Sequence, residues 1–392
     1  MSNSRLGDQT VRAIAEQYGE LEVFTSEAAS NPVAVMLVGQ EGAGRHALMN
    51  EVEANLNQKG GFVATNAERI RETLPYLGQL QPDQGDITTQ TREDVQRISQ
   101  AVYRQAIEHQ RNLIVEGAQS SPEDTLALAK ELRAAGYRVE VHAVAVNDQI
   151  SYARATMMYE HEKAAGRPAR YVSQNEHDRG FAEATNTVRR LEYAGAVDRV
   201  VIYNRLNDPI IDAAPIAGKP VAGDAFDRAR AQLTDYERIN LAEKWDAIIE
   251  GMERRGASPA DNYRVKERAE RAHYTLRSSP TAREAYDYQN PTDKHRSEEL
   301  AIRYGHRLEE AFRQNDTATA ARLPELTNAF GQMAMAKQMG NEKGVAEAKF
   351  VNALQDRIAM GLRVGAEFKP VSIHDARIEQ PRALSNAVEM QR

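Results

Sequence analysis

The 392-residue sequence contains no cysteine, and it has no apolar run that approaches the roughly 20 residues of a membrane-spanning helix. Without cysteine the protein has no disulfide, no thiolate metal site and no thiol nucleophile, which suits a reducing compartment. The polar N-terminus also lacks the apolar core of a signal peptide. We therefore expect a cytoplasmic protein without a membrane partner, and we leave export by a specialised secretion system open.

The sequence also lacks blocks of charge of one sign. Its 50 Lys and Arg residues are interspersed with 57 Asp and Glu residues, and the net charge is −7. Such a surface gives no reason to expect a nucleic-acid partner. The length and a hydrophobic fraction of 41% are sufficient for two domains, each with its own core.

Apolar runs alternate with helical patterns in the first half of the chain. The runs are nearly all apolar, which is typical of strands covered on both faces. The predicted strands are Val33–Val38, Phe62–Ala64, Leu113–Val115, Val139–Val146 and Arg199–Tyr203. Alternating strands and helices predict a mainly parallel α/β sheet with right-handed crossovers.

Helix ends can be recognised on both sides of this pattern. An N-terminal helix is expected within residues 8–29, and the stretch Ser121-Pro122-Glu123-Asp124 predicts a capped helix start that Gly136 closes at the other end. After the Pro-, Gly- and Asp-rich segment 207–220 no convincing strand follows.

The second half shows helical stripes of apolar residues, such as Leu241, Trp245, Ile248 and Met252. Two further stripes are Leu300, Tyr304, Leu308 and Phe312, and Phe350, Leu354 and Ile358. We predict four parts: an N-terminal helix (1–30), an α/β domain (31–213), an all-α domain (214–365) and a loosely ordered tail (366–392).

The stretch GQEGAGRHAL, Gly39 to Leu48, directly follows the first predicted strand and has the layout of a phosphate-binding loop. Glycines allow backbone N–H groups to point into a concavity at a helix N-terminus. Where such loops carry lysine and then serine or threonine, this chain has Arg45 and His46. Arg45 keeps the positive charge, whereas imidazole is a poor ligand for Mg²⁺. On the loop alone, a packing turn and a phosphate site are equally supported.

The order of segments around this loop resembles the zeta toxin family, over roughly residues 31–205. The segments are GQEGAGRHAL, NAERIRETLP (Asn66 to Pro75), LIVEGA (Leu113 to Ala118), YRVEVHAVAVNDQISYARA (Tyr137 to Ala155) and GRPARYVS (Gly166 to Ser173). The resemblance implies a P-loop NTPase-like fold. It also implies the activity of P-loop kinases of toxin–antitoxin systems, which phosphorylate a UDP-activated amino sugar with ATP or another NTP and Mg²⁺.

The resemblance assigns roles by position. It implies Glu68 as the general base, Glu116 and Gln100 as acceptor-binding residues, and Arg170 as the cation on the transferred phosphoryl group, with Arg45 assisting. Arg154 and Arg167 are close enough in sequence to share that last role. The nucleotide-binding residues would be Gly39, Gln40, Glu41, Gly42, Ala43, Gly44, Arg45 and His46. No histidine spacing indicates a protein metal site.

Two functional hypotheses follow. The first is a divergent zeta-like kinase that acts on a small acceptor. The second is a catalytically degenerate pseudokinase that binds a partner through its helical half, because six residues depart from the family at positions that matter. These residues are Arg45, His46, Glu68, Gln100, Ala118 and Ser120. An antitoxin or another protein partner is expected to bind helical regions.

Overall fold

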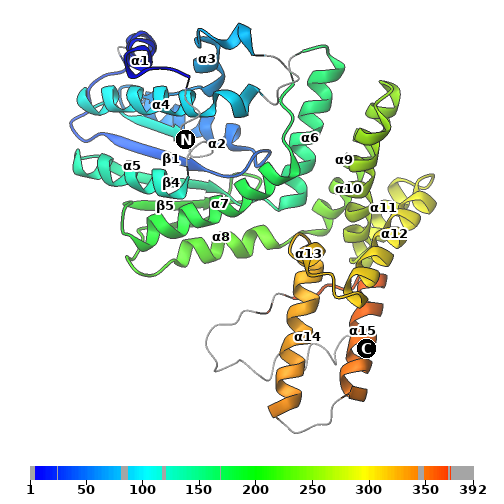
Figure 1. Cartoon of the computed structure of the whole chain (residues 1–392). Helices are drawn as coiled ribbons and strands as arrows, with labels where there is room; N and C mark the ends of the chain where they lie inside the picture. The colour runs from blue at the N-terminus through cyan, green and yellow to red at the C-terminus, as the bar shows by residue number, and fades with distance from the viewer. Residues whose placement is uncertain are drawn as a thin grey trace. The chain divides into compact units, whose positions relative to one another are not determined.

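A computed structural model of the chain describes residues 5–23, 25–80, 87–116, 121–167, 169–342, 348–369 and 371. The chain divides into two compact units, Met1–Leu233 and Thr234–Arg392. In the described part of the first unit helices surround a sheet, and in that of the second the regular structure is helical (Figure 1). No helix among the described residues is long and apolar enough to cross a membrane.

One sheet, with six strands among the described residues, forms the frame of the N-terminal unit in the order β2-β3-β1-β4-β5-β6. The first five strands are parallel, and β6 runs antiparallel to β5. The strands are β1 (Val33–Val38), β2 (Val63–Ala64), β3 (Leu113–Glu116), β4 (Arg138–Val144), β5 (Arg199–Tyr203) and β6 (Pro209–Ala213). The predicted mainly parallel α/β fold is confirmed.

The helices of this unit cover both faces of the sheet. They are α1 (Asp8–Glu22), α2 (Arg45–Asn57), α3 (Ala67–Glu72), α4 (Ile87–Glu108), α5 (Pro122–Ala134), α6 (Asp148–Ala164), α7 (Gln174–Tyr193) and α8 (Val221–Ala231), with a 3₁₀ turn at Leu77–Gln79. Alternate β1 residues, Ala34, Met36 and Val38, join a core with residues of α1, α4, α5, α7 and α8. Because side chains alternate along a strand, Val35 and Leu37 face the other side.

Local sequence explains the helix ends that were predicted. The Ser121 side chain accepts a hydrogen bond from the Asp124 N–H, and Pro122 occupies the first helical position of α5. Gly136 follows the helix with φ of 88°, a left-handed conformation that favours glycine. The N-terminal helix is shorter than expected and ends at Glu22.

The Pro-, Gly- and Asp-rich segment 207–220 contains the sixth strand, β6, which was not predicted. The strand is mostly exposed, and its only adjacent aliphatic residues are Ile210 and Ile211, too short a run to predict β6 from the sequence. The compact unit also extends past the predicted boundary at residue 213 and includes α8. Glu192 of α7 accepts hydrogen bonds from the N–H groups of Ala222 and Gly223, which ties the start of α8 to α7.

The described part of the C-terminal unit is a set of helices, as predicted. The helices are α9 (Asp235–Arg254), α10 (Pro259–Arg277), α11 (Pro280–Gln289), α12 (Lys294–Arg313), α13 (Thr317–Ala320), α14 (Pro324–Glu342) and α15 (Ala348–Val364). The first two predicted stripes are buried, but Phe350 of the third is 41% exposed. Most of the predicted tail lies outside the described residues.

A buried polar cluster joins four helices of this unit. His273 contacts Ser297 Oγ through Nδ1 at 2.8 Å and Asp246 Oδ1 through Nε2 at 3.2 Å, and Tyr286 donates to Asp246. Hydrolase triads use the opposite ring nitrogens, with serine on Nε2. Because His273 and Ser297 are also buried, the cluster holds α9, α10, α11 and α12 together rather than forming a reactive serine.

Replacing Gly305 by alanine is expected to destabilise the C-terminal unit. A Cβ at Gly305 would lie 2.3 Å from the Arg363 carbonyl oxygen, so α12 and α15 would have to separate. We expect a loss of about 1–3 kcal/mol in the free energy of unfolding, measured by urea denaturation. Gly251→Ala in α9 is the control, because a Cβ there meets nothing within 4 Å; it should stabilise by about 0.5–1 kcal/mol. Equal effects of the two changes would contradict the close approach.

The stability of the N-terminal unit should depend on Glu140 at acid pH. Burial alone would raise the pKa of Glu140, but His142, Arg199 and Arg138 lower it from its ordinary 4.5 to about 2. A carboxylate with a depressed folded-state pKa contributes stability above its ordinary pKa and loses it as the pH falls through the folded value.

Glu140→Gln should therefore cost about 1–2 kcal/mol at pH 7, a figure reduced because both arginines are partly in solvent. The difference from the wild type should narrow as the pH falls from 4.5 towards 2, as followed by urea denaturation. Glu123→Gln, at an exposed pair with Arg190, should cost about 0.5 kcal/mol or less at every pH. A Glu140→Gln cost that does not change with pH would contradict this assignment.

Candidate phosphate site

The loop from Gly39 to Gly44 connects the carboxyl end of central strand β1 to the N-terminus of α2. Gly42 has φ of 75° and Gly44 has φ of 93°, both in the left-handed region that favours glycine. Gly44 is the N-cap of α2 and provides no side-chain cap. The first N–H groups of a helix lack partners within the helix, and with the helix dipole they favour an anion at this end.

The loop is packed tightly against α6. A Cβ at Gly42 would lie 1.9 Å from the Ser151 carbonyl oxygen and 3.1 Å from the Ala155 backbone nitrogen. No side chain fits there, so glycine is required for contact as well as for conformation. The neighbouring Ala43 is buried.

A buried network below the loop holds the side chain of Gln40. Its amide donates to the Val146 carbonyl oxygen at 2.9 Å and to Ser151 Oγ at 3.0 Å, and Ser151 Oγ also lies 2.9 Å from His177 Nε2. The Gln40 side chain is 2% exposed. This member of the predicted nucleotide-binding set therefore fixes the loop to α6 and α7 with its side chain, and only its backbone is left for a ligand.

Arg230 of α8 completes this network and was not predicted from the sequence. It is 1% exposed, donates to Thr185 Oγ1 and to the Phe181 carbonyl oxygen, and lies 3.4 Å from Gln40 Oε1. Burial lowers the pKa of Arg230 to about 9. The sequence carries no signal for it, because the contact joins residues 190 positions apart.

Two of the predicted phosphate-binding arginines meet beside the loop. Glu41 Oε1 lies 3.5 Å from Arg45 Nη2 and 3.0 Å from Arg170 Nη1, while Arg45 also donates to the Gly39 carbonyl oxygen. Arg170 Nη2 binds Glu176 at 3.0 Å. Burial alone would raise the pKa of Glu41, but the two arginines hold it below its ordinary value. The structure thus brings Arg45 and Arg170, far apart in sequence, to the same carboxylate.

The other two arginines considered for this role, Arg154 and Arg167, lie in different places. Arg154 of α6 lies at the loop, since its Nη1 is 3.3 Å from the position of a Cβ on Gly44. Arg167 instead pairs with Glu162, Nη2 to Oε1, at 2.9 Å on an exposed surface. His46 at the start of α2 is exposed.

The residues predicted for the acceptor side lie on β3, α3 and α4. Glu116 ends β3 at the level of Leu37, two residues before the loop begins, and it is half-buried. Glu68 is exposed in the first turn of α3, where Asn66 accepts hydrogen bonds from the Glu68 and Arg69 N–H groups. Gln100 is half-buried in α4. Ala118 and Ser120 lie outside the described residues.

Three polar side chains that were not predicted as site residues, those of Tyr18, Thr65 and Tyr103, also lie on the acceptor side. Tyr103 and Thr65 share a hydrogen bond of 2.7 Å between their hydroxyls, and the Asn66 N–H donates to the Tyr18 hydroxyl. Burial raises the pKa of Tyr103, and the charge of Glu116 raises it further. Tyr103 therefore links Glu116 on β3 to the segment that precedes α3, and Tyr18 connects α1 to the cap of α3.

Comparison with known proteins agrees with this architecture. Residues 17–213, half of the chain, match the family described as Zeta toxin. The chain belongs to the zeta toxin family. Toxin PezT of Streptococcus pneumoniae serotype 4 is 23% identical over 189 residues, which cover 48% of this chain and 74% of PezT.

Solved structures resemble this zeta-family chain in fold. One is a chain from the PezAT chromosomal toxin–antitoxin system of Streptococcus pneumoniae, with a TM-score of 0.52 and 18% identity over 65% of this chain and 99% of that one. Another is the AvrRxo1-ORF1:-ORF2 complex, with a TM-score of 0.42 and 10% identity over 67% and 84% of the two chains. The first supports the fold, and the second is too distant to carry an argument.

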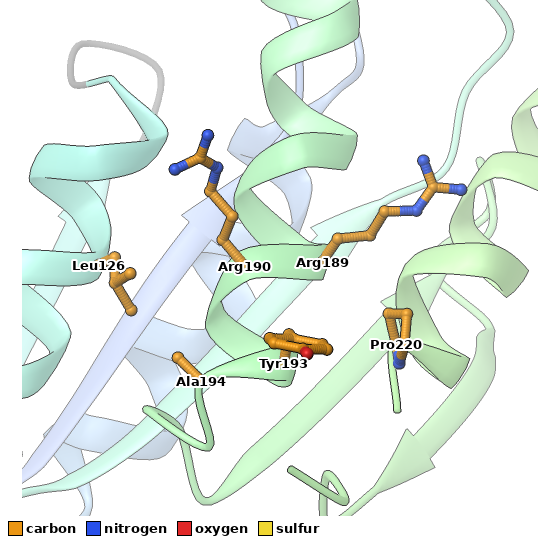
Figure 2. Close-up of a pocket in the computed structure, with 6 residues that line it drawn as sticks. All are labelled: Leu126, Arg189, Arg190, Tyr193, Ala194 and Pro220. Atoms are coloured by element: carbon orange, nitrogen blue, oxygen red, sulfur yellow. The ribbon is translucent and has the colours of Figure 1, made fainter. Parts of the chain in front are cut away.

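A separate surface pocket of about 300 Å³ lies between α5, α7 and the start of α8 (Figure 2). It is lined by Leu126, Arg189, Arg190, Tyr193, Ala194 and Pro220. Both arginines are already paired with acids: Arg190 with Glu123, and Arg189 with Asp224 and Asp227.

Replacing Gly42 by alanine is expected to displace the loop of this zeta-family chain from α6. The added Cβ would meet the Ser151 carbonyl and would also oppose a positive φ, so we expect a loss of roughly 2–4 kcal/mol in stability, measured by thermal or urea unfolding. Gly136→Ala is the matched control: it has a similar φ but open space around the Cβ, and it should cost about 1 kcal/mol. The same cost for both would show that the Ser151 contact is unimportant.

Proposed function

We propose that this protein is an NTP-dependent phosphotransferase that acts on a small acceptor, a UDP-activated amino sugar or a related nucleotide-sugar hydroxyl. ATP or another NTP would supply the phosphoryl group. The observation that carries the proposal is the convergence of Arg45 and Arg170 on one point beside a glycine loop at a helix N-terminus.

This arrangement suits phosphoryl transfer. In that reaction the protein mainly positions the reactants and neutralises the charge that spreads over the transferred group. The loop backbone would hold the donor phosphates, with Arg45, Arg154 and Arg170 beside it. A packing turn would need the glycines, but it would not need arginines from two separate helices and a connection.

The acceptor side provides carboxylates for the remaining roles. Glu116, level with Leu37 at the end of β3, would hold the acceptor with Gln100, since open α/β sheets bind ligands at the carboxyl ends of their strands. Glu68 would accept the proton from the acceptor hydroxyl as a general base. Its exposed position in the first turn of α3 allows substrate access.

The residues present do not fit a Mg²⁺ ion held directly by the protein. His46 follows Arg45 where a hydroxyl would serve, and magnesium prefers oxygen ligands. Among the described residues no group of three or more His, Asp or Glu side chains is arranged to hold a metal ion. If Mg²⁺ takes part, the donor's phosphates and water would supply its ligands.

A protein partner is also proposed. A chain of the PezAT toxin–antitoxin system shares this fold, so an antitoxin that binds helical regions of this chain is the partner we expect. The competing proposal is a pseudokinase that acts through its helical unit. It is favoured by His46 and by the engagement of both arginines with Glu41.

The test is a titration with ATP and Mg²⁺ followed by a radiolabel transfer assay with a UDP-activated amino sugar. Arg170→Ala should reduce the transfer rate by roughly 100- to 1,000-fold, because the cation on the transferred group is lost. Arg167→Ala is the matched control, since Arg167 lies on the same connection but pairs with Glu162 on the surface; it should leave the rate unchanged.

The outcomes separate the two proposals. An absence of nucleotide binding at millimolar ATP would reject the phosphotransferase. ATP binding without transfer to any nucleotide sugar, together with a biological effect that survives Arg45→Ala and Arg170→Ala, would favour the pseudokinase.

A further inference from the structure

Glu41 places a carboxylate within the phosphate-binding loop itself. Its Oε1 atom contacts Arg170 Nη1 at 3.0 Å and approaches Arg45 Nη2 at 3.5 Å. The Glu41 side chain is 32% exposed, and the Arg45 side chain is 13% exposed. The two guanidinium groups therefore share one partly buried oxygen atom.

A carboxylate at this place repels an incoming phosphate. It also occupies the two arginines that the phosphate would need, so both effects weaken phosphate binding. The pKa of Glu41 lies below its ordinary value because the two arginines outweigh the effect of burial. The carboxylate is thus ionised at neutral pH. Each arginine that would contact a phosphate oxygen already contacts a carboxylate oxygen, which has similar charge and hydrogen-bond geometry.

The rest of the Arg170 guanidinium supports this interpretation. Its Nη2 atom binds Glu176, which also binds Arg92 at 3.4 Å. Its Nε atom is buried and has no hydrogen-bond partner. Arg170 is therefore anchored on one side by Glu176, engaged by Glu41 on the other, and left with a buried donor that a larger anion could satisfy.

We propose that the Glu41 carboxylate acts as a built-in competitor for the outer phosphate of the nucleotide. In the ligand-free protein it holds Arg45 and Arg170 together and fastens the connection before α7 to the loop. A nucleotide displaces the carboxylate and takes over both arginines. This inference rests on the proposed function, and it adds a residue that sets the affinity of the same site.

The experiment compares ATP·Mg²⁺ binding to the full-length wild type and Glu41→Gln by isothermal titration calorimetry. Glutamine keeps the size of the side chain and removes its charge. We expect Glu41→Gln to bind ATP roughly 1.5- to 5-fold more tightly, the range for a partly exposed ion pair. AMP, which lacks the outer phosphates, should bind both proteins equally.

Two controls test whether the gain in ATP affinity comes from the release of the arginines. Glu162→Gln removes a carboxylate that pairs with Arg167 on an exposed surface, and it should leave the affinity unchanged. In an Arg170→Gln background the Glu41→Gln change should lose most of its effect, because the two residues act as a pair. Melting temperatures of all variants show whether each has folded.

The failure of this inference is distinguishable from the failure of the proposed function. If the wild type binds ATP and Glu41→Gln binds it equally or more weakly, Glu41 positions the arginines rather than competing with phosphate, and the inference is overturned alone. If a folded Glu41→Gln binds ATP where the wild type does not, the inference is supported. If neither binds ATP, both the inference and the phosphotransferase are rejected.

Discussion

The Ser151 carbonyl oxygen lies where a side chain on residue 42 would have to be, and this contact fixes the phosphate loop against α6. Gln40 strengthens the attachment from below through Val146 and Ser151. Since the loop cannot move without breaking buried hydrogen bonds, its backbone geometry is set before any ligand arrives. Such preorganisation is what makes a polar site effective, because no reorganisation is needed at the moment of reaction.

The same attachment determines where the charges of the site lie. The helix α6 leads directly into the connection that carries Arg170, and α7 begins with Glu176 close behind it. With the loop fixed to α6, the ion pairs of Arg170 with Glu41 and Glu176 hold Arg170 beside Arg45. Glu41 and Glu176 pair with these two cations, so the departure at Arg45 and the carboxylate of Glu41 are best understood together, as parts of one ion-pair network.

The sequence was sufficient for the features that depend on neighbouring residues. The apolar run of β1, the glycine loop after it and the Ser121 cap of α5 are local patterns with local causes, and each appears where it was predicted. The role of Glu68 as a base and of Glu116 as an acceptor ligand came from the family resemblance, and both remain predictions.

The features that the sequence did not reveal depend on distant contacts. Strand β6 is mostly exposed and pairs with the edge of β5, and its apolar residues Ile210 and Ile211 form too short a run to predict a strand. Nothing in the sequence around Arg230 distinguishes it from other helical arginines. Only the fold shows that it is buried next to the loop and donates a hydrogen bond to Thr185. The engagement of Glu41 with Arg170 joins positions 129 apart, and no local rule predicts such a pair.

The most direct test of the account is a crystal structure of the full-length protein with a non-hydrolysable ATP analogue and Mg²⁺. The account predicts that the phosphates lie against the backbone of Gly39 to Gly44 and that Arg45 and Arg170 contact phosphate oxygens, with the Glu41 carboxylate displaced from both. A nucleotide bound elsewhere, with Glu41 still joined to the two arginines, would contradict it.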